Sequence, residues 1–154
     1  MAQPAHANGH DALAMLTDDH RHVRALFQQY ADTLDPYLKQ IIAEHVFAEL
    51  TLHLLLEATV LYPAVAEKAD AEGKRLVSEA RQDHQQLSNL MEILDEIDDD
   101  TAFESSFHAL REQVEQHVEV AETVMFPLAQ HVLATHLEEI AGLLQERKAQ
   151  ILAS

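Results

Sequence analysis

Apolar residues recur along this chain in steps of three and four, which is the period of an amphipathic α-helix. Residues 1–10 lack this period and contain Pro4, Asn8 and Gly9, so we expect them to form a flexible tail. The first apolar stripe predicts a helix from about Asp11 to Thr33. Its inward positions are Leu16, His20, Val23, Phe27, Tyr30 and Leu34.

A second helix is predicted to follow Asp35, because an aspartate before a proline is typical of an N-cap and the first helical residue. Pro63 cannot donate a hydrogen bond to the carbonyl of Thr59. We therefore expect Pro63 to kink or end this helix, with a short continuation to Gly73. The inward positions are Ile42, Val46, Glu49, His53, Leu56 and Val60.

Two further stripes predict a third and a fourth helix. The acidic run 95–100 closes the third helix, and Thr101 with Glu104 forms a capping-box pattern that opens the fourth. Pro127 interrupts the fourth helix, and an amphipathic tail follows it. The inward positions are Ala80, His84, Leu87, Met91 and Leu94 in the third helix, and Phe103, Phe107, Leu110, Val114, His117, Ala121 and Val124 in the fourth.

Long helices joined by short loops predict an antiparallel up-down-up-down four-helix bundle with an extra C-terminal helix. The composition agrees with an all-α fold, because the 154 residues are 47% hydrophobic and include only 3 glycines and 4 prolines. A chain of this length fits one domain, which we expect to occupy residues 11–154.

The chain also matches itself when it is shifted by 64 residues. The matched pairs are Asp19-His20 with Asp83-His84, His53 with His117, and Tyr62-Pro63 with Phe126-Pro127. An internal repeat indicates how two halves are related in space. We therefore expect a duplicated helix pair, with halves at about 11–72 and 75–136.

Composition limits the classes of partner. The formal net charge of −17 repels phosphate backbones and anionic lipids, so neither nucleic acid nor a membrane surface is an expected partner. The absence of cysteine excludes disulfides, thiolate nucleophiles and iron–sulfur clusters. No apolar run approaches the roughly 18 residues of a membrane span, and the polar N-terminus is not typical of a secretory signal. These features predict a cytoplasmic protein.

Each of the four predicted helices carries one histidine on its apolar stripe: His20, His53, His84 and His117. A single histidine in such a position is usually a core residue bonded to a neighbour. Four histidines at one depth of an antiparallel bundle form a cluster instead, and an unpartnered buried polar group is costly. We therefore expect the cluster to bind metal.

Two carboxylates follow these histidines. Glu57 comes four residues after His53, about 40° around the helix, so both side chains can point at one ion. Glu122 comes five residues after His117, about 140° around a regular α-helix. If Glu122 is a ligand, a one-residue π-bulge between it and His117 must return it to the inner face, and we predict that bulge.

These residues resemble the hemerythrin-like, or HHE, domain family over about residues 11–130. The matching phrases are DHRHVRALF, HLLLEATVLYPA, DHQQL and HVEVAETVMFP. The resemblance implies a four-helix bundle enclosing two iron ions, bridged by two carboxylates and a solvent-derived oxo or hydroxo group. It implies that one iron is bound by His20 and His53 and the other by His84 and His117, with bridges from Glu57 and Glu122.

The chain departs from the family's oxygen carriers at Ser88, where they have a second histidine on the third helix. Two histidines per iron leave both irons a position open to water or a diatomic ligand, unless another group fills one. Glu49, one turn before His53, is either that group or a carboxylate paired with Arg24 or a histidine.

The donor types suit iron, manganese or zinc, and the resemblance favours iron. It implies a non-haem di-iron protein that binds or senses dioxygen or a related small ligand, such as nitric oxide or peroxide. The alternative is a di-iron enzyme that decomposes hydrogen peroxide, which the serine at position 88 favours by opening a second coordination position. Iron storage of the ferritin kind is disfavoured, because no histidine has a glutamate three residues before it.

Overall fold

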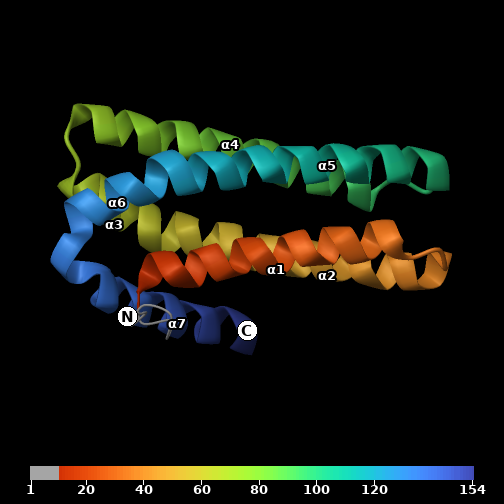
Figure 1. The fold of residues 1–154 in the computed structure, drawn as a ribbon, viewed down its shortest axis with the longest axis horizontal. Helices are drawn as coiled ribbons and strands as arrows, with labels where there is room; N and C mark the ends of the chain where they lie inside the picture. The colour runs from red at the N-terminus through yellow and green to blue at the C-terminus, as the bar shows by residue number, and fades with distance from the viewer. Residues whose placement is uncertain (1–10) are drawn as a thin grey trace.

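The computed structural model describes residues 11–154, and the tail expected at residues 1–10 lies outside the described residues. Four long helices form an all-helical bundle (Figure 1). Helices α1 (Ala12–Asp32) and α2 (Pro36–Leu56) form one pair, and α4 (Ala71–Asp95) and α5 (Asp100–Val120) form the other. The part of the chain that is described contains no β-strand, so the all-α prediction is confirmed.

Short segments extend two of the long helices. The π-helical segment η2 continues α2 into α3, and the π-helical segment η3 continues α5 into α6. A 3-10 turn, η4, then leads into α7, which lies alongside the pair of α1 and α2 (Figure 1). The bounds of these segments are Glu57–Leu61 for η2, Tyr62–Lys68 for α3, Ala121–Met125 for η3, Phe126–Leu133 for α6, Ala134–His136 for η4 and Leu137–Ala153 for α7.

The element bounds repeat at the interval seen in the sequence. Helix α2 begins at Pro36 and α5 begins at Asp100, and both run directly into a π-helical segment of 5 residues. Each bound of α5 and η3 lies 64 residues after the corresponding bound of α2 and η2. The two halves therefore place their second helix, and the irregularity that follows it, at equivalent positions in the sequence.

Aspartates fix the beginnings of the helices. Asp35 accepts a hydrogen bond from the backbone N–H of Tyr37 at 2.9 Å, which is the predicted cap of α2. Asp99, and not Thr101, caps α5 by accepting from the N–H of Ala102 at 2.8 Å. The capping-box prediction was wrong because the acidic run already supplies a side-chain acceptor just before the helix.

The second helical run continues past Pro63 instead of ending there. In η2 the N–H of Tyr62 donates to the carbonyl of Glu57, so the turn just before the proline is one residue wider than an α-turn. This wider turn accommodates a residue that cannot donate to the carbonyl of Thr59. The run ends at Lys68 and Asp70 caps a new helix, so the predicted continuation to Gly73 was wrong.

Apolar side chains pack above and below the level of the stripe histidines. One core cluster includes Leu16 and Leu56, and the other includes Val23 and Leu50. His20 and His53 fall between these pairs along their helices, so apolar packing on both sides excludes water from their level. Three predicted inward positions, Leu34, Glu49 and Val124, were wrong, and the Glu49 side chain is 42% exposed. Leu34 is 93% exposed because α1 ends at Asp32, and Val124 is 37% exposed because it lies in the wider turn of η3.

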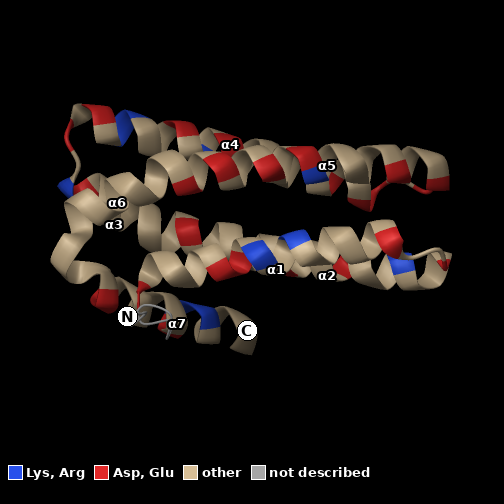
Figure 2. Cartoon of the chain, in the orientation of Figure 1, with Lys and Arg blue, Asp and Glu red and all other residues tan. Residues whose placement is uncertain are grey.

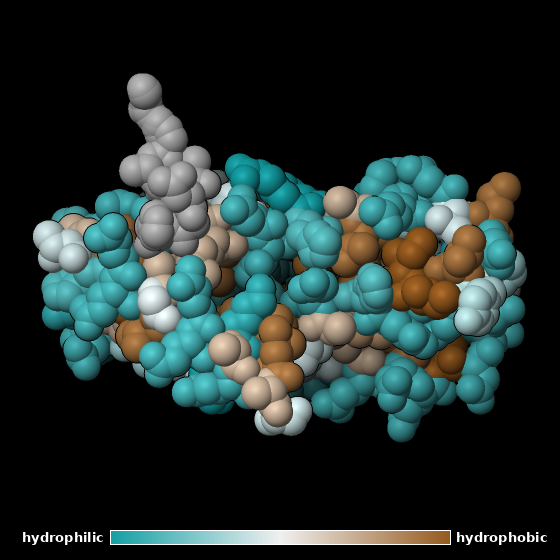
Figure 3. Space-filling view, turned by 90° about the horizontal axis from the view of Figure 1, so that it is seen from below, coloured by the Kyte–Doolittle hydropathy of each residue, from teal (hydrophilic) through white to brown (hydrophobic). Residues whose placement is uncertain are grey.

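The surface is mainly acidic. Asp and Glu residues are spread along all four long helices, with few Lys and Arg between them (Figure 2). Exposed apolar side chains gather on the half of the molecule that holds the α1–α2 loop (Figure 3). The most exposed of them, Leu34 and Tyr37, lie in that loop and at the start of α2.

Only one helical run among residues 11–154, Pro36–Lys68, is long and apolar enough to cross a membrane by length and composition alone. The run is a core element of the bundle, because it carries the buried His53 and Glu57 and packs along α1. Its hydropathy therefore does not by itself indicate a membrane protein.

Candidate metal centre

Buried donor atoms from four long helices and one π-helical segment converge in the middle of the bundle. The ligand atoms of His20 (α1), His53 (α2), Glu57 (η2) and His117 (α5) lie within 4.8 Å of one another. His84 from α4 joins them, with its Nε2 atom 3.0 Å from Glu57 Oε1. We call these five buried residues the donor cluster.

Glu57 lies between two sets of histidines. Its Oε2 atom is 3.3 Å from His53 Nε2. Its Oε1 atom faces the other half of the chain, 3.0 Å from His84 Nε2 and 3.3 Å from His117 Nε2. The two oxygens of this fully buried carboxylate therefore face opposite sets of histidines. A carboxylate that bridges two cations has this arrangement.

The outer nitrogens of two cluster histidines are held by carboxylates. His20 Nδ1 lies 2.8 Å from Glu122 Oε2, and His53 Nδ1 lies 3.0 Å from Asp19 Oδ2. Because a carboxylate only accepts, both Nδ1 atoms carry the hydrogen, and in neutral rings the Nε2 atoms keep their lone pairs. These two Nε2 atoms are 3.1 Å apart. Two lone pairs at this distance require a cation, either a proton or a metal ion.

The charges in the cluster determine which side chain carries a proton when no metal is bound. Burial lowers the pKa of His53, but Glu57 and Asp19 outweigh it and raise the pKa to about 10. Burial and the neighbouring His53 lower the pKa of His20 to about 4. Burial raises the pKa of Glu57, but His53 and His117 hold it well below its usual range. Near neutral pH, a protonated His53 therefore faces an ionised Glu57.

Protonation does not satisfy every donor atom of the cluster. Glu57 Oε2, His84 Nδ1 and His117 Nε2 are buried without a hydrogen-bond partner. An unsatisfied buried polar atom costs about 1–3 kcal/mol. Inward-facing lone pairs, an ionised carboxylate and orphaned polar atoms fit a metal ion, and imidazole with carboxylate suits iron, manganese or zinc.

Two of the residues singled out in the sequence lie outside the donor cluster. Glu122 is on the outer side of His20 and is 35% exposed. Glu49 is 42% exposed and lies 3.4 Å from His22 Nε2, so it is a surface carboxylate paired with a histidine. Arg24, its other expected partner, pairs with Glu115 instead.

The structure contains a π-helical turn near the position predicted for it. The segment η3 begins at Ala121, so it includes Glu122 and the residues after it and does not lie wholly between His117 and Glu122. A second π-helical segment begins at Glu57, where no irregularity was predicted. The four-residue spacing of His53 and Glu57 already places both side chains on one face of a regular helix, so it does not predict a bulge.

Sequence reasoning missed two residues that touch the donor cluster. Asp19 holds His53, and the phenol oxygen of Tyr62 lies 2.9 Å from His84 Nε2. A signal for both was present, because Asp19-His20 and Tyr62-Pro63 are among the pairs that the 64-residue shift matches. The match alone does not indicate which of the paired polar side chains face the histidines.

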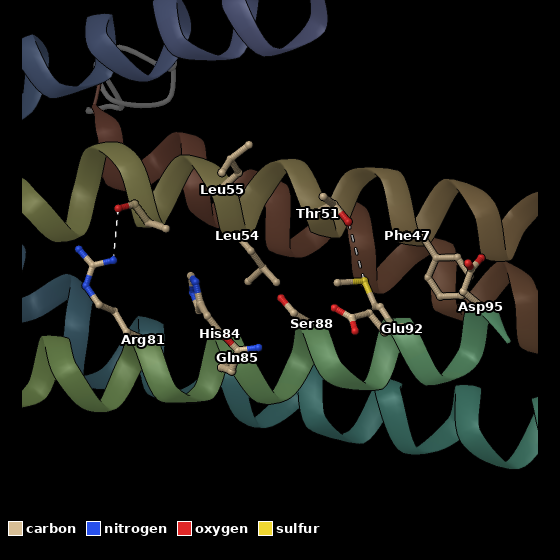
Figure 4. A pocket seen from close by; sticks show the side chains of 12 residues that line it. Phe47, Thr51, Leu54, Leu55, Arg81, His84, Gln85, Ser88, Glu92 and Asp95 are labelled. Carbon is tan, nitrogen blue, oxygen red and sulfur yellow. Dashed lines mark hydrogen bonds between the residues drawn. The ribbon is translucent and has the colours of Figure 1, made fainter. Parts of the chain in front are cut away.

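A groove leads from the surface to one side of the donor cluster. It lies between α2 and α4, has a volume of about 660 Å³, and is lined by Leu54, His84 and Ser88 among others (Figure 4). His84 and Ser88 point from α4 towards α2, and Leu54 points back at them (Figure 4). His84 is the residue of the donor cluster that lines this groove, beside the serine.

The comparisons with known proteins agree with this geometry. The family model for the hemerythrin HHE cation binding domain matches residues 11–129, a range that contains the whole donor cluster. No curated protein and no solved structure gives a match. The resemblance seen in the sequence is confirmed, and the chain belongs to the hemerythrin HHE cation-binding domain family.

Proposed function

We propose that the donor cluster holds two iron ions and that the protein binds dioxygen or a related small ligand at them. The observation that carries this proposal is the position of Glu57, with one oxygen towards His53 and the other towards His84 and His117. The donor atoms of His20, His53, Glu57 and His117 lie close enough together to surround one ion, and His84 supplies the further donor, on the Glu57 oxygen that also faces His117. A carboxylate with histidines on both sides supports two ions that share it.

The residues of the cluster would divide between the two ions. His20 and His53 would bind one ion, His84 and His117 the other, and Glu57 would bridge them. Two irons joined in this way supply the electrons that binding or reduction of dioxygen or peroxide requires. In the present geometry Glu122 orients His20 through its Nδ1 atom, and a bridging role would require this side chain to turn inward.

We infer that the two-ion arrangement arose by duplication of a helix pair. Each half supplies an early histidine and a late histidine at matched positions, and the same π-helical segment follows the late one. The halves differ at the bridging carboxylate, because Ala121 stands where the first half has Glu57. One buried bridge therefore serves both halves.

The acidic surface supports a small ligand. With a net charge of −17 spread along all four long helices, the protein repels phosphate backbones and anionic lipid surfaces (Figure 2). We expect neither nucleic acid nor a membrane as partner, and we expect the protein to act in the cytoplasm. Dioxygen, nitric oxide and hydrogen peroxide are neutral, so this field does not exclude them.

The proposal is tested by elemental analysis and an optical spectrum of the iron-loaded chain. We expect two irons per chain and the charge-transfer absorption of an oxygen-bridged iron pair. Exposure of the reduced protein to air should then give a stable coloured adduct. An iron content well below two per chain would contradict the two-ion arrangement.

A second candidate function is decomposition of hydrogen peroxide. It is favoured by Ser88, which lines the groove beside His84 where a histidine would close a coordination position. Adding peroxide to the iron-loaded protein separates the two functions. Sustained evolution of oxygen without a stable adduct in air would establish the enzyme, whereas a stable adduct with little turnover would establish the binding protein.

Ser88→Phe should slow ligand entry. The larger ring would fill the groove beside His84, and an added barrier of about 1.4 kcal/mol reduces an association rate tenfold. We expect the association rate of nitric oxide with the reduced iron protein, measured by stopped flow, to fall by roughly that factor. Ser88→Ala, the control, should leave the rate unchanged or raise it. An unchanged rate in Ser88→Phe would show that ligands enter elsewhere.

Asp19→Ala should weaken metal binding without removing a cluster residue. Asp19 accepts the Nδ1–H of His53 and thereby fixes the ring with Nε2 pointing inward. Loss of such a partner typically costs about 10- to 100-fold in metal affinity. We expect this loss in competition titrations with a chelator. Asp18→Ala, which removes an exposed aspartate paired with Arg21, should bind metal like the unchanged chain.

A further inference from the structure

The two sides of the donor cluster differ in the aromatic residue that covers them. On the first side, Phe126 stacks on the ring of His20 at a centroid distance of 5.7 Å. On the second side, the matched residue is Tyr62, whose ring lies 5.0 Å from that of His84. The phenol oxygen of Tyr62 is 2.9 Å from His84 Nε2. The second side therefore has an additional oxygen donor that the first side lacks.

The hydrogen-bond distances among the donor atoms on this side match the spacing of neighbouring ligands around one cation. An ion with six ligands at about 2.1 Å places neighbouring ligand atoms about 3.0 Å apart, because each edge of an octahedron is √2 times the bond length. His84 Nε2 lies 2.9 Å from Tyr62 Oη and 3.0 Å from Glu57 Oε1. His117 Nε2 lies 3.3 Å from the same carboxylate oxygen and has no hydrogen-bond partner.

The position of Tyr62 follows from the π-helical segment before it. The N–H of Tyr62 bonds to the carbonyl of Glu57, which closes the wide turn of η2. A regular α-helix advances 100° per residue, so five residues from Glu57 would bring Tyr62 about 140° away from it. The extra residue of the π-turn reduces that angle and lets both side chains face His84.

We propose that Tyr62 is a ligand of the cation on the His84 and His117 side. This inference rests on the proposed metal centre. On binding, the phenol proton leaves to solvent and the oxygen forms the metal bond, so no electron transfer is involved. An anionic oxygen ligand stabilises the oxidised state of iron, so the two irons become inequivalent and the second one favours the ferric form.

The test compares the chain with its Tyr62→Phe variant, both loaded with iron and oxidised. A ferric ion bound to a phenolate gives a visible charge-transfer band, and resonance Raman excitation in that band shows phenolate ring modes. We expect both signals in the unchanged chain and the loss of both in Tyr62→Phe. The variant should fold, because Phe126 occupies the matched position in the other half. Tyr37→Phe, at an exposed position, should retain both signals.

The iron content of the same samples distinguishes failure of this inference from failure of the metal centre. Two irons per chain without phenolate modes would overturn the role of Tyr62 and leave the centre intact. One iron with phenolate modes would support Tyr62 and contradict the two-ion arrangement. Phenolate modes that persist in Tyr62→Phe, or a chain that binds no iron at all, would overturn the assignment of Tyr62.

Discussion

Glu57→Gln is expected to abolish the binding of two irons. The glutamine has the same shape, but its amide nitrogen is not a metal ligand, so one side of the cluster loses its shared donor. Removing groups that merely orient ligands costs about 10- to 100-fold in affinity, and loss of the bridge itself should cost more than that. We expect elemental analysis to find one iron per chain or fewer after loading and gel filtration.

The same substitution should destabilise the metal-free protein. Glu57 is fully buried and faces His53, which carries a proton near neutral pH. Breaking a buried ion pair by removing one partner costs about 3–5 kcal/mol. We expect this loss in the free energy of unfolding by urea at pH 7. Glu49→Gln, in the helix α2 that leads into η2, is the matched control and should change neither property measurably. Two irons retained in Glu57→Gln would contradict the bridging role.

The helical part of the fold could be predicted because one face of each helix is apolar. The stripe from Leu16 to Tyr30 is buried at every expected position. The predictions that were wrong include the starts of two helices, which side-chain hydrogen bonds to the backbone determine. Asp70 and Asp99 cap helices that were predicted to begin later, because a single aspartate side chain fixes a helix start whatever the apolar period beyond it.

The convergence of the four stripe histidines could be inferred because helical position and depth in an antiparallel bundle determine it. The carboxylates were harder to place. Glu57 was correctly placed on the inner face, but Glu122 and Glu49 depend on the local winding of the helix and on competing partners at the surface. A spacing in sequence gives an angle on a regular helix, and η3 is not regular.

The contact between Tyr62 and His84 could not be predicted from spacing alone. These residues are 22 positions apart and meet across two helices, and Tyr62 faces the cluster only because η2 is wider than an α-turn. The sequence contained a hint, since Tyr62 replaces the phenylalanine of the other half. A polar substitution between matched core positions of a repeat is therefore worth testing as a sign of a functional difference between halves.

In the absence of metal, the stability of the protein is expected to fall as the pH rises from about 6.5 to 10. Glu57 and Asp19 outweigh burial and raise the pKa of His53 to about 10, whereas an unfolded histidine has a pKa near 6.5. Between these values the folded state binds one more proton than the unfolded state. Raising the pH therefore favours unfolding, by an amount on the order of a few kcal/mol over the whole window.

The pKa of His20 is shifted in the opposite direction, and this shift determines how the stability of the metal-free protein changes at acid pH. Its pKa is lowered to about 4 by burial and by His53, so the unfolded state binds more protons between about 4 and 6.5. Stability should therefore also fall as the pH drops through that range. Metal-free protein should be most stable near the boundary of the two windows, at slightly acid to neutral pH.

His53→Ala isolates the alkaline part of this dependence. The variant loses the raised pKa, so the decline in unfolding free energy between pH 7 and 9.5 should disappear, and emptying this core position should cost about 2–5 kcal/mol at pH 7. Urea unfolding of the metal-free proteins at several pH values measures both effects. His45→Ala, at an exposed position on the same helix, should keep the decline.

Bound metal should also abolish the decline in the unchanged chain, because the ion then occupies the place of the proton on His53. A metal-free stability that stays constant from pH 7 to 9.5 would contradict the protonated histidine, and with it the ion pair at the centre of the cluster.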